Sequence, residues 1–276
     1  MRINHNIAAL NTHRQLGSAS NAQMKNMEKL SSGLRINSAA DDAAGLSISE
    51  KMRGQIRGLE QASKNSQDGI SMIQTAEGAL NETHDILQRM RELAVQSSSD
   101  TNTADDRAQI QKENADLILE IDRIATTTEF NTQKLLDGKG GTATDGNFTF
   151  QIGANEDQTL TVTFADMQSG ALGVDLIDLG ADSATSTAAI TLIDDAIKLV
   201  SDERSQLGAK QNRLEHTINN LNTSSENLTA AESRIRDVDM AKEMMQQTKN
   251  SILSQAAQAM LAQANQQPQG VLQLLR

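Results

Sequence analysis

A seven-residue repeat of apolar side chains over residues 190–235 constrains the fold of this chain more than any other feature. The repeating positions, taken as d of a heptad, are Ile193, Val200, Leu207, Leu214, Leu221, Leu228 and Ile235. Such spacing is typical of a helix that packs in a coiled coil. The a positions are mixed, reading Ile190, Ile197, Arg204, Gln211, Ile218, Ser225 and Glu232. Mixed a positions favour a defined register over maximal stability.

A weaker heptad stripe runs through residues 52–94. Its members are Met52, Leu59, Ser66, Ile73, Leu80, Leu87 and Ala94, so one Ser interrupts it. Neither stripe can be buried alone, and we therefore expect the two segments to form long helices, roughly 65–75 Å each, that pack on one another. A third, shorter helix is expected after Asn102-Thr103 and would pack beside them through Ile110, Leu117, Ile121 and Ile124.

The middle of the chain, residues 138–189, has a different composition. Gly, Thr and Asp accumulate there, and residues 147–152 and 159–164 alternate apolar and polar side chains. This alternation predicts a β-hairpin. Gly138-Lys139-Gly140-Gly141 lacks the flanking residues of a phosphate-binding loop and is interpreted as a turn that enters the hairpin. Residues 181–189 are expected to be an exposed link to the long helix.

Both ends of the chain are predicted to be amphipathic helices. The apolar residues that define them are Ile3, Ile7, Leu10, Met24, Met27 and Leu30 at the start, and Val238, Met245, Ile252, Leu253, Met260 and Leu261 near the end, where Pro268-Gln269-Gly270 predicts a stop. Two interpretations of these aromatic-free faces remain open. They pack within the chain as ordinary helices do, or they contact other molecules.

Charge and composition exclude several classes of function. The net charge is −11; residues 1–36 carry +4 and residues 237–276 carry 0, and subtracting these leaves −15 for residues 37–236. An acidic middle argues against nucleic acid as a partner, because binding phosphates needs clustered Lys and Arg. The chain contains no Cys, so disulfides and thiolate metal sites are impossible. Without an apolar stretch long enough to span a bilayer, or the features of a signal peptide, composition alone predicts a cytoplasmic location and no membrane partner.

No constellation in the sequence points to catalysis, a metal or a cofactor. The histidines His5, His13, His84 and His216 do not have the spacing of zinc ligands. The acidic pairs Asp41-Asp42 and Asp237 with Asp239 are interpreted as helix caps. There is no Ser-His-Asp arrangement or GxSxG motif. We therefore expect a protein that is not an enzyme, with neither catalytic residues nor a cofactor.

Six segments of the chain form a recognisable set. They are residues 1–12, Leu30 to Leu46 (LSSGLRINSAADDAAGL), Gln88 to Gln96, Glu120 to Ile124, Ala230 to Asp239 and Gln263 to Arg276. With matches near both ends at once, the chain closely resembles bacterial flagellin. The resemblance implies a mainly α fold: an antiparallel coiled-coil bundle of long helices with a small β-hairpin region, and terminal helices paired as a separate inner domain. Its domains would be residues 1–40 with 237–276, and a rod-like domain of residues 41–236 that includes the hairpin segment at about 138–189.

The resemblance also implies function and partners. The chain would polymerise with itself into the extracellular filament used for swimming, after export without a cleaved signal peptide through the flagellar secretion channel. Ile3, Ile7, Leu10, Met27, Leu30, Met245, Ile252, Leu253, Met260 and Leu261 would be the assembly residues. Further partners would be the flagellar cap and junction proteins, and a cytoplasmic secretion chaperone at the C-terminal helix.

One internal segment resembles the flagellin patch recognised by the host Toll-like receptor for flagellin. It consists of Arg89, with Leu93 one helical turn away as an apolar anchor, and Glu113 on the adjacent helix. The plainer interpretation is a solvated helix face with one Leu in the bundle. Two alternatives to a filament subunit stay open at this point: a hook–filament junction protein that shares the terminal pattern, and a coiled-coil binding protein that does not polymerise.

Overall fold

The structure, a computed structural model, describes residues 6–141, 145–180 and 182–274. It divides into two compact units, residues 1–54 with 227–276, and residues 55–226. Helices α2 (Ala43–Ser97) and α5 (Ser183–Arg236) each contribute residues to both units. The boundaries expected from the sequence, at residues 40 and 237, fall just outside these two helices, and they stay a prediction.

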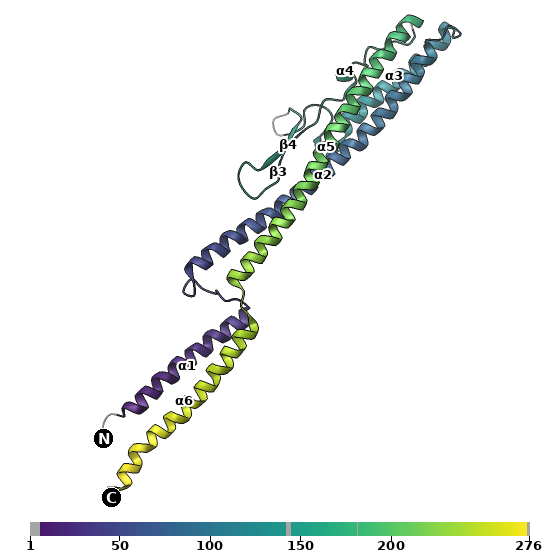
Figure 1. The fold of residues 1–276 in the computed structure, drawn as a ribbon. Coiled ribbons are helices and arrows are strands. Elements are labelled where there is room, and N and C mark those ends of the chain that lie inside the picture. Colours follow the sequence, from purple (N-terminus) through teal and green to yellow (C-terminus); the bar gives the residue numbers. More distant parts are fainter. Residues whose placement is uncertain (1–5, 142–144, 181, 275–276) are drawn as a thin grey trace. The chain divides into compact units, whose positions relative to one another are not determined.

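The core of the unit formed by residues 55–226 is a bundle of α2, α5 and α3 (Ala104–Thr127), which lie side by side in Figure 1. Heptad positions of both stripes meet in this core, and the buried ones are Ile73, Leu80, Leu87, Ala94, Ile193, Val200, Leu207 and Leu214. Ion pairs from Arg91 to Asp194 (2.6 Å) and from Arg204 to Glu77 (3.9 Å) show that α2 and α5 are antiparallel. The predicted long-helix bundle is therefore confirmed.

The two long helices extend beyond their heptad stripes. α2 has 55 residues and α5 has 54, which at 1.5 Å per residue gives about 80 Å each. Leu221 is buried, whereas Leu228 and Ile235, which belong to the other unit, are half-buried. The seam is thus most tightly packed in its first five positions.

The exposed link predicted at residues 181–189 is wrong from Ser183 onward. Asp182 caps the helix, its Oδ1 accepting from the backbone N–H of Thr185 at 2.8 Å. Ser186 is buried and its hydroxyl lies 3.0 Å from the hydroxyl of Ser97, while Ala189 also enters the core. Small Ser and Ala side chains let α5 approach α2 closely there, and the same composition resembles a loop when only the sequence is considered.

Helix α3 begins as the sequence predicts. Thr103 and Asp106 form a capping box, in which the Thr103 hydroxyl accepts from the Asp106 N–H and the Asp106 carboxylate accepts from the Thr103 N–H. Beyond α3, the two-residue strands β1 (Glu129–Phe130) and β2 (Gln133–Lys134) form a tight hairpin that the sequence analysis missed. A short helix, α4 (Ser169–Leu172), follows later in the chain.

The predicted hairpin is present as β3 (Asn147–Gln151) and β4 (Thr159–Thr163), paired antiparallel with Thr149 opposite Thr161. Phe148 packs edge-to-face on Phe164, with ring centroids 5.5 Å apart. The hairpin rests on α2 at two glycines: a Cβ on Gly69 would lie 3.4 Å from the Phe150 ring, and one on Gly58 would lie 2.9 Å from the Cβ of Ala154. The absence of a side chain at both positions lets the hairpin approach α2 closely.

The unit formed by the two ends of the chain contains a pair of helices, α1 (Ile7–Ser32) and α6 (Met240–Leu274), which lie side by side (Figure 1). Gly33 ends α1 in the left-handed conformation, with φ of +71°, and donates to the Lys29 carbonyl at 2.9 Å. Leu34 then pairs with Asp237 in an antiparallel bridge. This bridge joins the segment that follows α1 to the segment just before α6.

Helix α6 does not stop near Pro268, as the sequence predicted, but continues to Leu274. Proline has no N–H, so it frees the carbonyl of residue 264, four positions earlier. The side-chain nitrogen of Asn6 donates to that carbonyl at 2.7 Å, while the Asn6 oxygen accepts from the Ala9 N–H at 3.1 Å and caps α1. The acceptor that proline leaves open is therefore satisfied from the other helix.

Candidate functional site

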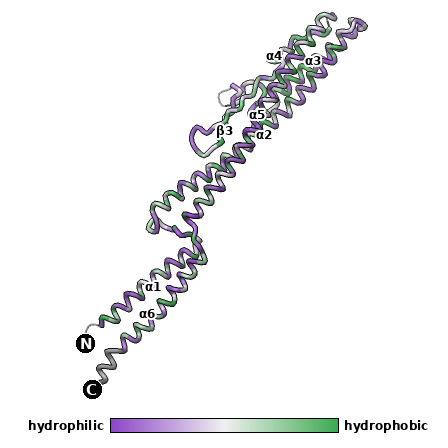
Figure 2. Tube along the Cα trace, viewed as in Figure 1, coloured by the Kyte–Doolittle hydropathy of each residue, from purple (hydrophilic) through white to green (hydrophobic). Residues whose placement is uncertain are grey.

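Large apolar side chains of α1 and α6 are exposed to solvent. On α1 these are Ile7 (68% exposed), Leu10, Met24 and Met27, and on α6 they are Met244, Met245 (68%), Ile252, Leu253 and Met260. Figure 2 shows hydrophobic and hydrophilic residues interspersed along both helices. Of the assembly residues predicted from the sequence, Leu30 and Leu261 are half-buried and Ile3 lies outside the described residues. Two helices thus carry uncovered apolar faces.

The residues that α1 and α6 bury completely are instead small or polar. They are Asn26, Asn250, Ala257 and Ala264, while the leucines of these helices are at most half-buried. A helix pair that placed its Met, Ile and Leu inside would bury more apolar area than this one does. The arrangement therefore leaves the strongest hydrophobic surface available for contact with another molecule.

Two grooves accompany these faces. One, of about 410 Å³, lies between the helices and is lined by Gln15, Ser18, Ala19, Ala22, Asn250, Leu253, Ala256, Ala257 and Met260. The other, of about 360 Å³, lies along α1 and is lined by Ser20, Gln23, Met24, Met27, Glu28 and Ser31. Both combine methionine with small residues, a composition that accepts apolar side chains of varied shape.

The predicted receptor-recognition residues divide between surface and core. The Arg89 guanidinium donates to Glu113 Oε1 at 2.8 and 2.9 Å and to Glu92 Oε2 at 3.0 Å, and these bonds, that to Glu113 foremost, raise the pKa of Arg89. Leu93 is 1% exposed and belongs to the bundle core. Leu93 thus lies in the bundle, as the plainer interpretation expected, rather than on the surface where a receptor would reach it directly, and its part in receptor recognition stays a prediction.

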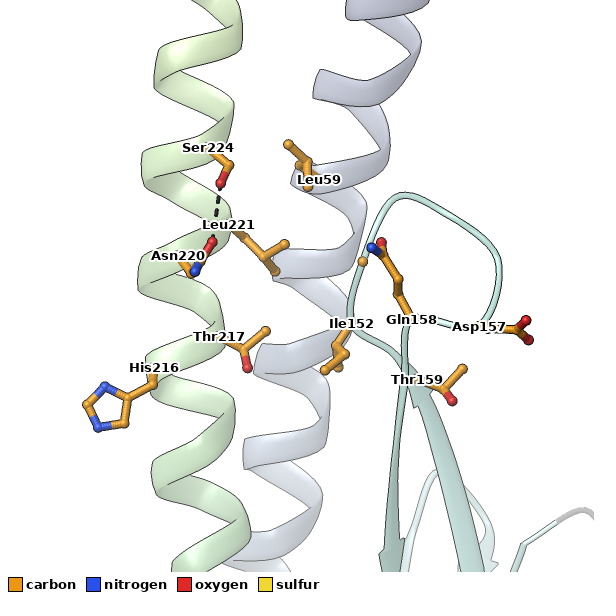
Figure 3. Close-up of a pocket in the computed structure, with 11 residues that line it drawn as sticks. Leu59, Ile152, Asp157, Gln158, Thr159, His216, Thr217, Asn220, Leu221 and Ser224 are labelled. Carbon is orange, nitrogen blue, oxygen red and sulfur yellow. Dashed lines mark hydrogen bonds between the residues drawn. The ribbon is translucent and has the colours of Figure 1, made fainter.

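A groove of about 590 Å³ lies at the tip of the β3–β4 hairpin (Figure 3). Leu59 of α2, Leu221 of α5 and Ile152 of the hairpin line it. The imidazole of His216 and the carboxylate of Asp157 point away from the groove on opposite sides, and Ser224 donates to Asn220 at 3.2 Å. These side chains do not form an acid–base or nucleophile–base pair.

Two of the acidic residues predicted as helix caps, Asp42 and Asp239, do cap helices, and Asp42 accepts from the Gly45 N–H of α2. The Asp41 carboxylate instead holds the turn before α2, because it accepts from the backbone N–H groups of Ser38 (3.0 Å) and Asn37 (3.2 Å), which lowers its pKa. Asp239 accepts from the Ala241 N–H at 3.1 Å, at the start of α6. Within residues 6–141, 145–180 and 182–274, no three metal-ligating side chains converge, and no helix is long and apolar enough to cross a membrane.

Taken together, a long-helix bundle and terminal helices with uncovered apolar faces define a class of protein: a helical subunit built to associate with other chains. Comparison with known proteins identifies the family. The model of the bacterial flagellin N-terminal helical region matches residues 3–140, and that of the C-terminal helical region matches residues 190–275. The chain belongs to the bacterial flagellin family and is a structural subunit of the flagellar filament.

Individual relatives support this assignment along the whole chain. The flagellin of Bacillus subtilis (strain 168) is 62% identical, and the alignment covers all of both chains. The flagellar filament 33 kDa core protein of Treponema phagedenis is 52% identical, again over both full lengths. The crystal structure of Bacillus cereus flagellin is 36% identical, covering 61% of this chain and 94% of that one, with a TM-score of 0.52.

A putative flagellar hook-associated protein from Vibrio parahaemolyticus shares the fold, with a TM-score of 0.61 over 71% of this chain and all of that one. At 14% identity, this likeness concerns the fold alone. The filament subunit is therefore the function that the comparisons support, and they do not favour a junction protein or a coiled-coil protein that does not polymerise.

Sequence reasoning missed the polar residues that lie between α1 and α6. Asn26 and Asn250 were not singled out because neither belongs to a recognised motif, and an Asn in a predicted helix is usually placed on the solvated face. The signal that could have found Asn26 is its position next to Met27 and two residues after Met24, on a helix whose apolar residues do not form one continuous stripe.

Proposed function

We propose that α1 and α6 form the inner domain of the filament and that their exposed apolar faces are the contacts through which subunits assemble. The observation that carries this proposal is the exposure of Ile7, Met245, Ile252 and Met260 on helices whose fully buried residues are only small or polar. Burying such side chains against a neighbouring subunit stabilises the polymer by roughly 1.5–3 kcal/mol for each fully covered residue.

Assembly of this kind generates a filament if the same contact repeats without closing into a ring. The terminal helices of a free subunit gain most of their burial only when a neighbour covers them, so their order and the polymer's stability are coupled. The acidic middle of the chain, at −15 over residues 37–236 once the +4 and 0 of the two ends are subtracted from −11, suits an outer surface that stays solvated.

The same exposed faces support a proposal of three further partners. We propose that a cytoplasmic chaperone covers the exposed face of α6, with Met244, Met245 and Leu253, before export through the flagellar secretion channel. The flagellar cap and junction proteins would contact the ends of the filament through surfaces like those of a neighbouring subunit. In each case the physical reason is that an uncovered apolar helix face in water favours association.

A receptor contact at Arg89 and Glu113 is a second proposal. Both side chains are about half exposed and already form a charge-assisted hydrogen bond that fixes their geometry on the surface of α2 and α3. A host Toll-like receptor for flagellin could exchange this internal partner for its own polar groups. Leu93 would contribute only by supporting the backbone of α2 from within the core.

Removal of both ends tests the assembly proposal. A chain reduced to residues 41–236 retains the buried core of α2, α3 and α5, so we expect it to be soluble, monomeric and strongly helical by circular dichroism. It should not elongate filament seeds, while the full chain does so under the same conditions. Continued elongation by the shortened chain would contradict the assignment of assembly to the terminal helices.

A further inference from the structure

Two asparagines are buried where α1 meets α6. Asn26 on α1 and Asn250 on α6 are each only 8% exposed, although Asn prefers solvent. Burying an amide without hydrogen bonds destabilises a protein, so residues in such positions need partners that offset this cost.

The partners of Asn26 all lie on its own helix or on one short stretch of α6. With its amide oriented to satisfy both ends, its nitrogen donates to Glu243 Oε1 at 3.1 Å and to the Ala22 carbonyl at 3.0 Å. Its oxygen accepts from the side-chain nitrogen of Asn250 at 3.0 Å and from the backbone N–H of Gln247 at 3.3 Å. Three of these four bonds join α1 to α6. They can form only when the two helices have one particular offset along their axes, which we call the stagger.

The apolar part of the contact is less specific. Its buried members are the small residues Ala257 and Ala264, whose methyl groups offer neither deep holes nor large knobs, while Leu16, Leu30 and Leu261 are only half-buried. A shift of one heptad would place similar small side chains against one another, but it would leave the buried amides unpaired. In coiled coils a single buried Asn specifies register by this mechanism, at some cost in stability.

A second contact agrees with the same stagger. The side-chain nitrogen of Asn6 donates to the backbone carbonyl oxygen of Ala264 at 2.7 Å, near the opposite end of the pair from the Asn26 cluster. From these observations we propose that the Asn26–Asn250 amide pair fixes the stagger of α1 against α6. By fixing the stagger, the pair positions the exposed apolar residues of both helices as one surface. This role in assembly rests on the function proposed above.

Single and double substitutions separate stagger from stability. In the full chain, Asn26→Leu or Asn250→Leu leaves the other amide buried and unpaired, and should lower the melting temperature of the filament. The double variant removes both amides and should recover that temperature, because replacing both partners by apolar groups is nearly neutral. Asn21→Leu and Asn265→Leu, at exposed positions on the same two helices, are the matched controls.

The stagger itself can be measured by disulfide formation, since the chain has no cysteine of its own. In the native combinations, Ala19→Cys is paired with Leu253→Cys or Ala257→Cys, since all three residues line the same groove. In the displaced combinations, Ala19→Cys is paired with Gln246→Cys, seven residues before Leu253, or with Ala264→Cys, seven residues after Ala257. Cross-linking is measured in free subunits and in filaments. The parent chain and both controls should cross-link in the native combinations only.

In the double Leu variant we expect the ratio of native to displaced cross-links to fall about tenfold, which corresponds to about 1.4 kcal/mol of register preference. The rate at which the double variant elongates filament seeds should fall as well. Native cross-links alone in the double variant, or both sets in the parent, would overturn the proposal for the stagger. Displaced cross-links with an unchanged elongation rate would instead overturn the assembly surface and leave the stagger in place.

Discussion

The backbone N–H of Ala165 donates to Glu203 Oε1 at 3.2 Å, which ties the chain just after β4 to the buried face of α5. Glu203 is 7% exposed and lies between Val200 and Leu207 of the heptad seam. Burial raises the pKa of the Glu203 carboxyl, and the hydrogen bond from Ala165 opposes this shift only in part. The carboxylate is thus held in place by one bond while its charge is unfavourable there.

Replacing Glu203 by Gln should therefore stabilise the fold at neutral pH. A pKa that is higher in the folded than in the unfolded state contributes stability that is fully present below the unfolded value, near 4.5, and is lost as pH rises through the folded value. Glu203→Gln keeps the acceptor oxygen without the charge. We expect a higher melting temperature at pH 7 and little change at pH 4, with Asp202→Asn as the exposed control; equal shifts at both pH values would contradict this.

The β1–β2 hairpin contains a strained turn that glycine should relieve. Its two turn residues, Asn131 and Thr132, have φ of +50° and +65°. Asn tolerates this region, but a β-branched residue such as Thr does not. Thr132→Gly should raise the free energy of unfolding by about 1 kcal/mol. The control, Thr161→Gly in the extended strand β4, should lower the free energy of unfolding by a similar amount. Urea unfolding measures both variants, and a loss of stability in both would contradict the account.

The heptad seam predicts a sharp contrast between residues on the two faces of α5. Leu207→Ala and Leu214→Ala remove side chains that are 1% and 0% exposed, and each should cost about 2–5 kcal/mol of stability. Leu192→Ala and Leu199→Ala, on the exposed face of the same helix, should cost far less. Thermal unfolding of the four variants provides the comparison, and similar losses in all four would show that the seam does not determine stability.

These cases show what the sequence could and could not predict. Heptads specify long helices because a 3.5-residue period seldom arises outside helical packing, and the alternation at residues 147–164 specified the hairpin through its period of two. The start of α5 at Ser183 and the passage of α6 through Pro268 were predicted wrongly. Both depend on distant partners, Ser97 for Ser186 and Asn6 for the Ala264 carbonyl, which local composition does not reveal. Whether Leu93 is buried stayed open in the sequence, because a motif does not state which face of a helix packs in the core.

The receptor proposal distinguishes Arg89 from Leu93. Arg89→Ala removes a surface group and should leave the subunit folded, because an exposed ion pair contributes little to stability. It should reduce potency in a receptor reporter assay by about tenfold or more if the guanidinium is a dominant contact. Leu93→Ala should instead lower the melting temperature. Arg123→Ala, which removes an exposed ion pair with Glu120, is the control. Unchanged potency of the Arg89 variant would contradict the receptor proposal and support the interpretation of a solvated helix face.

Seeded elongation by full-length variants tests the central claim most directly. A chain carrying Ile7→Ser, Met245→Ser and Ile252→Ser alters three exposed apolar residues of α1 and α6, whereas Leu119→Ser with Leu176→Ser alters equally exposed residues of the other unit, at 66% and 89% exposure. Circular dichroism should be unchanged in both. The account predicts that the first variant elongates seeds at least about tenfold more slowly than the parent chain, because lost burial weakens each subunit contact, while the second elongates normally. Normal elongation by the terminal variant would contradict it.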